Sequence, residues 1–262
     1  AGARAQSRVA VVVSLYNYGH FVEEALDSVK AQTLAGKDLI VVDDRSTDDS
    51  AAVARAWLKR NAGAFTHAAL LRNKVNSGLS LTRNAGFSFT DAPFIMVLDA
   101  DNRLAPECLE RCQAEIDRTG AAAAYSLIEK FGDDEGFLSK EPWLPSFLAV
   151  SNYIDAMAMI RRSAWERVGG YRDAAAQDGW QDYSFWCRFV EHGLWACWIA
   201  ERLAFYRVHG KSMLRTSTDH AEVKKDLIRR LRGKHAWLDL PELCRLSTGL
   251  VVILDGVIGF AG

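Results

Sequence analysis

Two carboxylates stand one residue apart in this chain, directly after an apolar run. Asp99 and Asp101 flank Ala100 and follow residues 94–98, whose sequence is FIMVL. Such a run is typical of a buried strand, so both carboxylates should emerge at a strand end. Hard oxygen ligands placed this way suit Mg²⁺ or Mn²⁺ and the phosphates that such an ion carries. A solvated turn or a helix cap is the alternative for an acidic pair, and the preceding apolar run favours the metal site.

Strands and helices alternate in the part of the chain that leads to this pair. We expect strands at 9–14, 39–42, 68–72 and 94–98, and helices at 21–32, from about 46 to 61, and at 79–90. This alternation predicts a parallel sheet with right-handed crossovers. Ligands bind such sheets at the carboxyl ends of the strands. Asn17, the pair Asp43–Asp44 and the stretch 99–101 all follow strands, so they should meet at one edge of the sheet.

The pattern changes after residue 102. We expect helices at 105–119, 163–168 (capped by Ser163) and 181–192, strands at 121–128, 194–198 and 203–208, an apolar segment at 154–161 and a loop at 132–145. No repeat and no clean linker interrupts the chain, which predicts a single α/β domain over residues 1–262. Its two halves would be residues 8–102 and 103–216, followed by a C-terminal helical extension at 217–262.

Composition limits the classes of protein to which the chain can belong. Hydrophobic residues make up 49% and charged residues 25%, the balance of a globular protein. A net charge of -1 gives no support for nucleic-acid binding through bulk charge. The five cysteines show no zinc-type spacing, and reduced thiols suit a cytoplasmic protein.

The two ends of the chain carry weaker signals. The small polar residues Ala1–Ser7 contain no apolar signal segment and are typical of a domain cut from a longer, multidomain protein. The apolar tail at 249–262 is interrupted by Asp255 and is shorter than the roughly 20 residues of a membrane span. We therefore predict a packed terminal helix. A peripheral contact with the inner face of a membrane stays open as the alternative.

Seven segments, in order, resemble those of family 2 glycosyltransferases with the GT-A fold. They cover residues 8 to about 216 and read VVVSLYNYGHFVEEALDSVKAQT, IVVDDRSTDDS, NSGLSLTRNAGF, FIMVLDADNRLAP, IRRSAWERVGGYRD, QDYSFWCR and YRVHGKSM. The resemblance implies a Rossmann-like, mostly parallel sheet flanked by helices, with a nucleotide-sugar-binding first half and an acceptor-binding second half. It also implies metal-dependent, inverting transfer of a sugar from a nucleotide-sugar donor, a UDP-sugar favoured, to a hydroxyl of a glycan or glycolipid acceptor in polysaccharide biosynthesis.

This resemblance implies a nucleoside pocket at the first two strand ends. Ser14, Tyr16 and Asn17 would line the space for the base and the ribose. Asp44 would accept a hydrogen bond from the edge of the base, with Ser46 close by. For Asp44 and Ser46 the alternative is capping of the following helix. Ser14 stands where the family often has Pro, a difference from which we expect little consequence.

The resemblance places other donor contacts on the helix at 79–90 and at the acidic pair. Arg83 would offset the charge of the diphosphate, and Asn84 would lie near the ribose. Asp99 would contact the ribose or a metal-bound water, with Ala100 beside the donor. For Arg83 the alternative is a surface salt bridge.

By the same resemblance, the metal ligands would be Asp101 and His209, with Mn²⁺ or Mg²⁺ as the ion. Asp182 would be the general base that takes the proton of the acceptor hydroxyl, and helix capping is its alternative. Trp180 and Gln181 would contact the acceptor, Trp180 by stacking on a sugar face. The family often has Glu where this chain has Gln181, so a charge that would raise the pKa of the base is missing.

Three other classes of protein share parts of this pattern. A response-regulator-like receiver also has paired aspartates after an early strand, but the length and the second half of this chain do not fit it. A nucleotidyltransferase would carry a Gly-rich basic loop after the first strand, whereas SLYNYGHF has one Gly and no Lys or Arg. A catalytically inactive, glycan-binding copy would have no chemical need to keep Asp101, Asp182 and His209 together.

Overall fold

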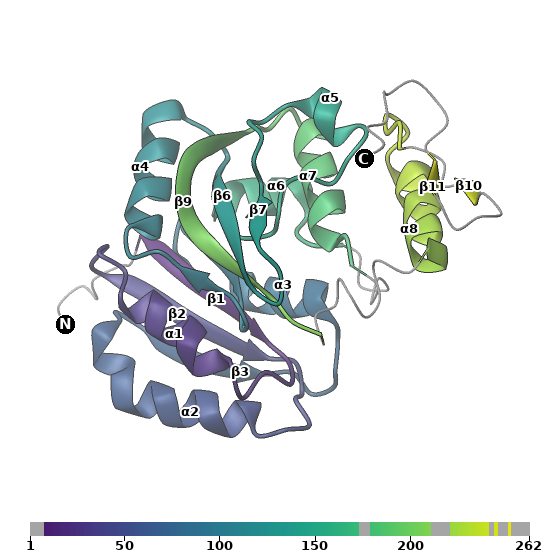
Figure 1. Cartoon of the computed structure of the whole chain (residues 1–262). Helices are drawn as coiled ribbons and strands as arrows, with labels where there is room; N and C mark the ends of the chain where they lie inside the picture. Colours follow the sequence, from purple (N-terminus) through teal and green to yellow (C-terminus); the bar gives the residue numbers. More distant parts are fainter. Residues whose placement is uncertain (1–7, 173–178, 211–220, 241–243, 246–250, 253–262) are drawn as a thin grey trace.

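A central sheet with helices on both faces forms the body of the molecule (Figure 1). The computed structural model describes residues 8–172, 179–210, 221–240, 244–245 and 251–252. The strands are β1 (Val9–Leu15), β2 (Lys37–Asp43), β3 (Ala68–Arg72), β4 (Phe94–Asp99), β5 (Arg103–Leu104), β6 (Ala123–Gly132), β7 (Gly136–Leu138), β8 (Ala158–Arg161), β9 (Ala196–Val208), β10 (Cys244–Arg245) and β11 (Val251–Val252).

Helices connect most of these strands. They are α1 (Val22–Lys30), α2 (Ser50–Asn61), the short 3-10 helix η1 (Ala62–Ala64), α3 (Leu79–Phe89), α4 (Cys108–Thr119), α5 (Pro145–Leu148), α6 (Arg162–Val168), α7 (Gln181–Glu191) and α8 (Ala221–Lys234). No helix in the described part of the chain has the length and apolarity needed to cross a membrane.

The sheet joins a parallel half to a mixed half. Its described strands follow the order β3-β2-β1-β4-β8-β6-β9-β5, with β7 paired to β6. β3, β2, β1 and β4 are parallel, as is the long β6–β9 pair, while β8 runs antiparallel to both β4 and β6. The predicted α/β sheet is thus confirmed as mostly parallel, and antiparallel β8 is the seam between its halves.

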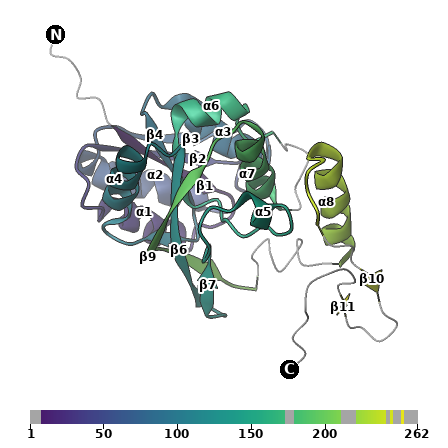
Figure 2. The same cartoon turned by 90° about the horizontal axis from the view of Figure 1, so that it is seen from above.

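Alternation along the central strands builds a separate core on each face. Val9, Val11 and Val13 of β1 pack with α1, α2 and α4, whereas Ala10 and Val12 pack with α3, α6 and α7. Figure 2 shows these two groups of helices on opposite sides of the sheet. Successive side chains of a strand point to opposite faces, so a run that is apolar throughout requires cover on both.

Several sequence expectations need correction. The stretch 132–145 contains a strand, β7, that extends β6 as a hairpin. The two strands expected at 194–198 and 203–208 are one strand, β9. Its pairing with β6 continues through the polar middle of β9 by way of two register shifts. Ser163 lies inside α6 rather than capping it, since that helix begins at Arg162.

The C-terminal extension is only partly helical. α8 packs its apolar side on the core beside α7 through Ile228 and Leu231. Beyond it, β10 and β11 pair as two short antiparallel strands. Val251–Val252 are therefore in a strand rather than in the terminal helix that we expected, and the remainder of the apolar tail lies outside the described residues.

The approach of α3 to the sheet depends on Gly86. A Cβ at this position would overlap Val12 Cγ1 and lie 3.2 Å from Val42 Cγ2, so α3 sits closer to β1 and β2 than a side chain permits. Val side chains are stiff at χ1 and cannot move aside easily. We expect Gly86→Ala to lower the free energy of unfolding by about 1–3 kcal/mol through overpacking.

Thermal unfolding measures this effect as a fall in melting temperature of roughly 2–4 °C for each kcal/mol. Gly63→Ala is the matched control, because a Cβ at Gly63 has no heavy atom within 4 Å. Equal melting temperatures for the two variants would contradict the close approach of α3.

Candidate active site

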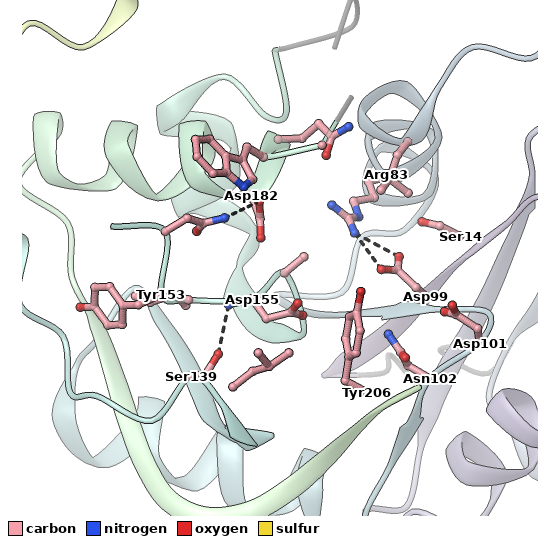
Figure 3. A pocket seen from close by; sticks show the side chains of 18 of the residues that line it. Ser14, Arg83, Asp99, Asp101, Asn102, Ser139, Tyr153, Asp155, Asp182 and Tyr206 are labelled. Carbon is pink, nitrogen blue, oxygen red and sulfur yellow. Dashed lines mark hydrogen bonds and ion pairs between the residues drawn. The ribbon is translucent and has the colours of Figure 1, made fainter. Parts of the chain in front are cut away.

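A cavity of about 940 Å³ opens where the carboxyl ends of β1 and β4 face the second half of the chain (Figure 3). Its far wall is formed by residues 137–141, 151–156 and the start of α7. The residues that sequence reasoning singled out and that line it are Ser14, Tyr16, Asp44, Arg83, Asp99, Asp101, Trp180, Gln181 and Asp182. The cavity thus brings these predicted residues together although the first and the last of them, Ser14 and Asp182, lie 168 positions apart in the chain.

Ser14 and Asp99 lie at the point where the parallel strand order turns from β1 to β4. The two residues are register partners on these adjacent strands. Ser14 Oγ is buried and has no hydrogen-bond partner within the described residues. Unpaired buried hydroxyls are costly, so an unpaired one in a cavity wall points to a ligand that completes it.

Arg83 reaches the same place from α3. Its Nη2 lies 3.0 and 3.1 Å from the two carboxylate oxygens of Asp99, and its guanidinium stacks over the ring of Tyr171. Burial alone would lower the pKa of Arg83, but Asp99, together with Tyr171 and Asp182, raises it above its ordinary value. The alternative of a surface salt bridge is wrong, because Arg83 is only 2% exposed.

Asp101 and His209 meet beside this pair. His209 Nε2 lies 3.2 Å from Asp101 Oδ2, and the imidazole packs edge-on against Tyr18. Burial and the neighbouring Asp99 raise the pKa of Asp101 to about 6, while His209 opposes the shift. A buried carboxylate that resists ionisation in this way is a fitting ligand for a cation, and imidazole is a second.

No three His, Cys, Asp or Glu side chains of the described residues form a ready metal cage. At a Mg²⁺ or Mn²⁺ site here, Asp101 and His209 would be the protein ligands, completed by substrate phosphates and water.

The turn that carries Asp101 is fixed by Arg207 of β9. Arg207 Nε donates to the carbonyl oxygen of Asp101 over 3.0 Å, and its backbone N–H donates to Asn102 Oδ1 over 2.8 Å. Its guanidinium forms an ion pair with Glu24 and stacks 4.3 Å above the ring centre of Phe21. Sequence reasoning missed this contact, although Arg207 stands two residues before His209.

Asp44 organises the loop that leads into α3. Its carboxylate accepts hydrogen bonds from the backbone N–H groups of Ser77 and Gly78, each over 2.8 Å, and from the side-chain amide of Asn73 over 2.7 Å. The capping alternative for Asp44 at α2 is therefore wrong, because its bonds go to the loop before α3. A carboxylate has about four acceptor sites, which leaves one for a ligand.

Three predicted donor residues are held by protein contacts outside the cavity wall. Asn17, in the left-handed region at φ 56°, accepts from the Thr47 N–H and donates its own N–H to Ser46 Oγ over 3.0 Å. Asn84 bonds to the backbone of Tyr171 and to the indole N–H of Trp165. These side chains fix the loops and helices behind the cavity rather than line it.

Two further predicted residues also lie behind the cavity surface. Ala100 is fully buried, and its N–H donates to the carbonyl oxygen of Ser14. His209 contacts Asp101 from outside the described wall of the cavity.

Asp182 stands in the first turn of α7, on the wall opposite Arg83. Its Oδ1 accepts from the Tyr183 N–H over 2.8 Å and lies 3.4 Å from Asn152 Nδ2. Burial raises the pKa of Asp182, while Arg83 and these hydrogen bonds lower it in part. Trp180 precedes it in the left-handed region at φ 59°, an uncommon conformation for a large side chain that recurs at functional sites.

A third carboxylate, Asp155, also lines the cavity and was not singled out from the sequence. Its Oδ1 accepts from the Met157 N–H over 2.8 Å, and burial together with Asp182 raises its pKa to about 7. A signal was present, since Asp155 is the one charged residue in the otherwise apolar stretch at 154–160. Strongly perturbed groups in a cleft are candidates for function.

A Rossmann-like strand order, an acidic pair at its switch point and a cavity shared with a second half define a GT-A nucleotide-sugar glycosyltransferase (EC 2.4). The chain belongs to glycosyl transferase family 2, whose family model matches residues 10–170, more than half of its length.

Curated relatives agree with this assignment. The chain is 24% identical to EpsE of Bacillus subtilis over 234 residues, which cover 86% of this chain and 83% of EpsE. It is 31% identical over 141 residues to the succinoglycan biosynthesis protein ExoU of Rhizobium meliloti, covering 49% of this chain and 40% of that protein. It also matches 19% of the chondroitin synthase of Pasteurella multocida at 24% identity, over 71% of this chain.

Solved structures share the fold. TarS 1-349 of S. aureus, in complex with UDP-GlcNAc, matches with a TM-score of 0.71 at 14% identity, over 87% of this chain and 66% of that chain. The mannosyltransferase PcManGT of Pyrobaculum calidifontis, in complex with GDP-Man and Mn²⁺, matches with a TM-score of 0.64 at 19% identity, over 88% and 62%.

The raised pKa of Asp155 makes the stability of the fold depend on pH. Its pKa is about 7 in the folded protein and about 4 in an unfolded chain, so between these values the folded state binds more protons. Stability from this group is therefore complete below pH 4 and is lost as the pH rises through 7. We expect Asp155→Asn, which cannot ionise, to raise the melting temperature relative to the parent by more at pH 8 than at pH 5.

Metal-free protein is used for this measurement, so that no ion bound in the cavity alters the comparison. Asp91→Asn serves as control, since the Asp91 side chain is 95% exposed and should show no such trend. A difference in melting temperature that stays constant from pH 5 to pH 8 would show that Asp155 ionises normally.

Proposed function

We propose that this chain is a metal-dependent, inverting glycosyltransferase that transfers a sugar from a UDP-sugar to a hydroxyl of a glycan or glycolipid. One observation carries the proposal: the cavity holds Ser14, Arg83 and Asp101 on one wall and the carboxylate of Asp182 on the other. A donor bound to the first wall would place its anomeric carbon between the two. An acceptor entering on the side of Asp182 then attacks from the face opposite the diphosphate.

Donor binding uses the switch-point residues. The hydroxyl of Ser14 and the buried Nε of Arg83 have no hydrogen-bond partner within the described residues, and both residues line the cavity that would hold the nucleotide. The positive charge of Arg83 would offset the negative charge of the diphosphate. The fourth acceptor site of the Asp44 carboxylate would be available to an N–H group of the base. A uracil N–H fits that site, and TarS, a structural relative, was solved with UDP-GlcNAc.

Chemistry requires one base. As the acceptor oxygen forms its bond to the anomeric carbon, the bond from that carbon to the diphosphate breaks, and Asp182 takes the hydroxyl proton. The raised pKa of Asp182 brings it closer to working pH, where a general base is most effective. Asp101 and His209 would hold the Mn²⁺ or Mg²⁺ ion, whose chemistry when bound is to stabilise charge on the leaving diphosphate.

Acceptor contacts come from the second half. Trp180 and Gln181 precede Asp182 in the chain and line the cavity beside it. The indole of Trp180 packs edge-on against Tyr183 and is thereby held in place as a platform for a sugar face. A glycan or glycolipid acceptor is favoured by this aromatic wall and by relatives such as the succinoglycan biosynthesis protein ExoU.

Calorimetric titration with UDP, GDP and dTDP, each with and without Mn²⁺, tests the donor half of the proposal. We expect UDP to bind only in the presence of the metal. Binding of GDP or dTDP in its place would reassign the donor class, whereas no binding in any condition would favour an inactive copy of the fold.

Asp101→Ala should abolish the gain in UDP affinity that Mn²⁺ provides, because the link between protein and diphosphate is lost. The same titrations measure it, and Asp91→Ala at the far end of β4 is the control. If Asp101→Ala binds UDP with Mn²⁺ as tightly as the parent, the metal assignment is wrong.

Asp182→Asn should bind UDP normally but lose about 10²–10⁴-fold in turnover, because the amide cannot accept the proton. Release of UDP in the presence of acceptor measures turnover. Asp117→Asn on the exposed side of α4 is the matched control. Normal turnover by Asp182→Asn would remove this residue from the role of base.

A further inference from the structure

Asp155 has no task in the mechanism above, yet its position is tightly fixed. It lies between α5 and β8, where its backbone N–H donates to Ser139 Oγ over 3.0 Å. Ser139 is itself held, because its carbonyl oxygen accepts from the indole N–H of Trp198 over 2.9 Å. The Met157 N–H donates to Oδ1, so one hydrogen bond fixes the carboxylate and another fixes the backbone of Asp155 in the cavity wall. Such preorganisation is typical of a group that must meet a ligand in one geometry.

The other oxygen of Asp155 is available for a ligand. Within the described residues Oδ2 accepts no hydrogen bond and Asp155 forms no ion pair, and the residue is partly exposed at the cavity surface. A carboxylate oxygen without a protein partner at a cavity wall can accept hydrogen bonds from a ligand that enters the cavity. Figure 3 shows the Asp155 side chain between Tyr153 and Tyr206, directed into the cavity.

The position of Asp155 relative to the proposed diphosphate and acceptor sites identifies that ligand. Asp155 lines the same cavity as Asp99 and Arg83, on the wall proposed for the diphosphate, and as Asp182, on the wall proposed for the acceptor (Figure 3). The transferred sugar joins the diphosphate to the reacting carbon, so its ring must lie between these ends. The remaining hydroxyls of the sugar are the groups that can reach a carboxylate there.

We propose that the Asp155 carboxylate accepts hydrogen bonds from ring hydroxyls of the donor sugar and thereby selects the sugar that is transferred. The inference rests on the proposed function and assigns a specificity contact within the same cavity. A hydroxyl placed at Oδ2 donates to the carboxylate oxygen that has no partner within the described residues. A donor that lacks this hydroxyl leaves Asp155 without it, and sites built to bond a hydroxyl discriminate strongly against such analogues.

The test compares UDP with UDP-glucose, UDP-galactose and UDP-GlcNAc in the presence of Mn²⁺. For the UDP-sugar that the parent binds best, we expect Asp155→Asn to weaken binding by about 10- to 100-fold, the range for a hydrogen bond to a charged group. Binding of UDP alone should change less than about twofold, because UDP carries no transferred sugar. Asp91→Asn should leave both affinities unchanged.

Donors that lack a single hydroxyl, at C2, C3, C4 or C6 of that sugar, locate the contact. The parent should bind one of these analogues more weakly than the complete UDP-sugar, by a factor comparable to that caused by Asp155→Asn. The Asp155→Asn variant should bind that analogue and the complete UDP-sugar equally, since variant and analogue remove the same hydrogen bond. The proposal is overturned if no analogue shows this coupling. It is also overturned if Asp155→Asn weakens UDP and UDP-sugar equally, which would give Asp155 a structural role.

Failure of the proposed function would look different. In that case the parent itself binds neither UDP nor any UDP-sugar. A variant that binds all ligands normally but loses turnover would instead make Asp155 a second candidate for the base and would likewise overturn the sugar contact.

Discussion

The buried ion pair between Arg83 and Asp99 is the interaction on which the cavity depends. It joins α3 to the end of β4, and the side chain of Arg83 is 3% exposed while that of Asp99 is 25% exposed. Removing the partner of a buried charge typically costs about 3–5 kcal/mol, because that charge, here Arg83, stays buried alone. The helix must therefore lie close to the sheet, and Gly86, one turn after Arg83, permits that distance.

Three further carboxyl groups lie around this pair, in surroundings that disfavour their ionised form. Asp101, Asp155 and Asp182 all have a raised pKa, and burial is the largest cause for each. A structure selected for stability alone would neutralise or expose such groups. The proposed function would explain their presence in one cavity, because its ligands would bring a cation, hydroxyl groups and a proton to be accepted. Stability and chemistry thus oppose each other at the same carboxylates.

Much of the first half could be predicted from the sequence, because local signals and tertiary structure agree there. Uniformly apolar runs such as VAVVV specify strands covered on both faces, and their ends place Ser14, Asp44 and Asp99 at one edge. Asn84 could not be assigned correctly, because its partners Trp165 and Tyr171 lie more than 80 positions away. Asp155 was missed since its neighbours in the cavity come from distant strands and helices.

The narrow seam between β4 and β8 has an evolutionary consequence. The registered pairs there run from Phe94 with Arg161 to Met96 with Met159, so few backbone contacts join the two halves of the sheet directly. Recombination that replaced the chain beyond the seam would have to match this short edge and the side chains of α4, α6 and α7 that pack on the two faces of β1. The cavity, however, draws a wall from each side, so an exchanged half would alter what is transferred as well as what receives it. Descendants of such an exchange would change both partners of the reaction in one step.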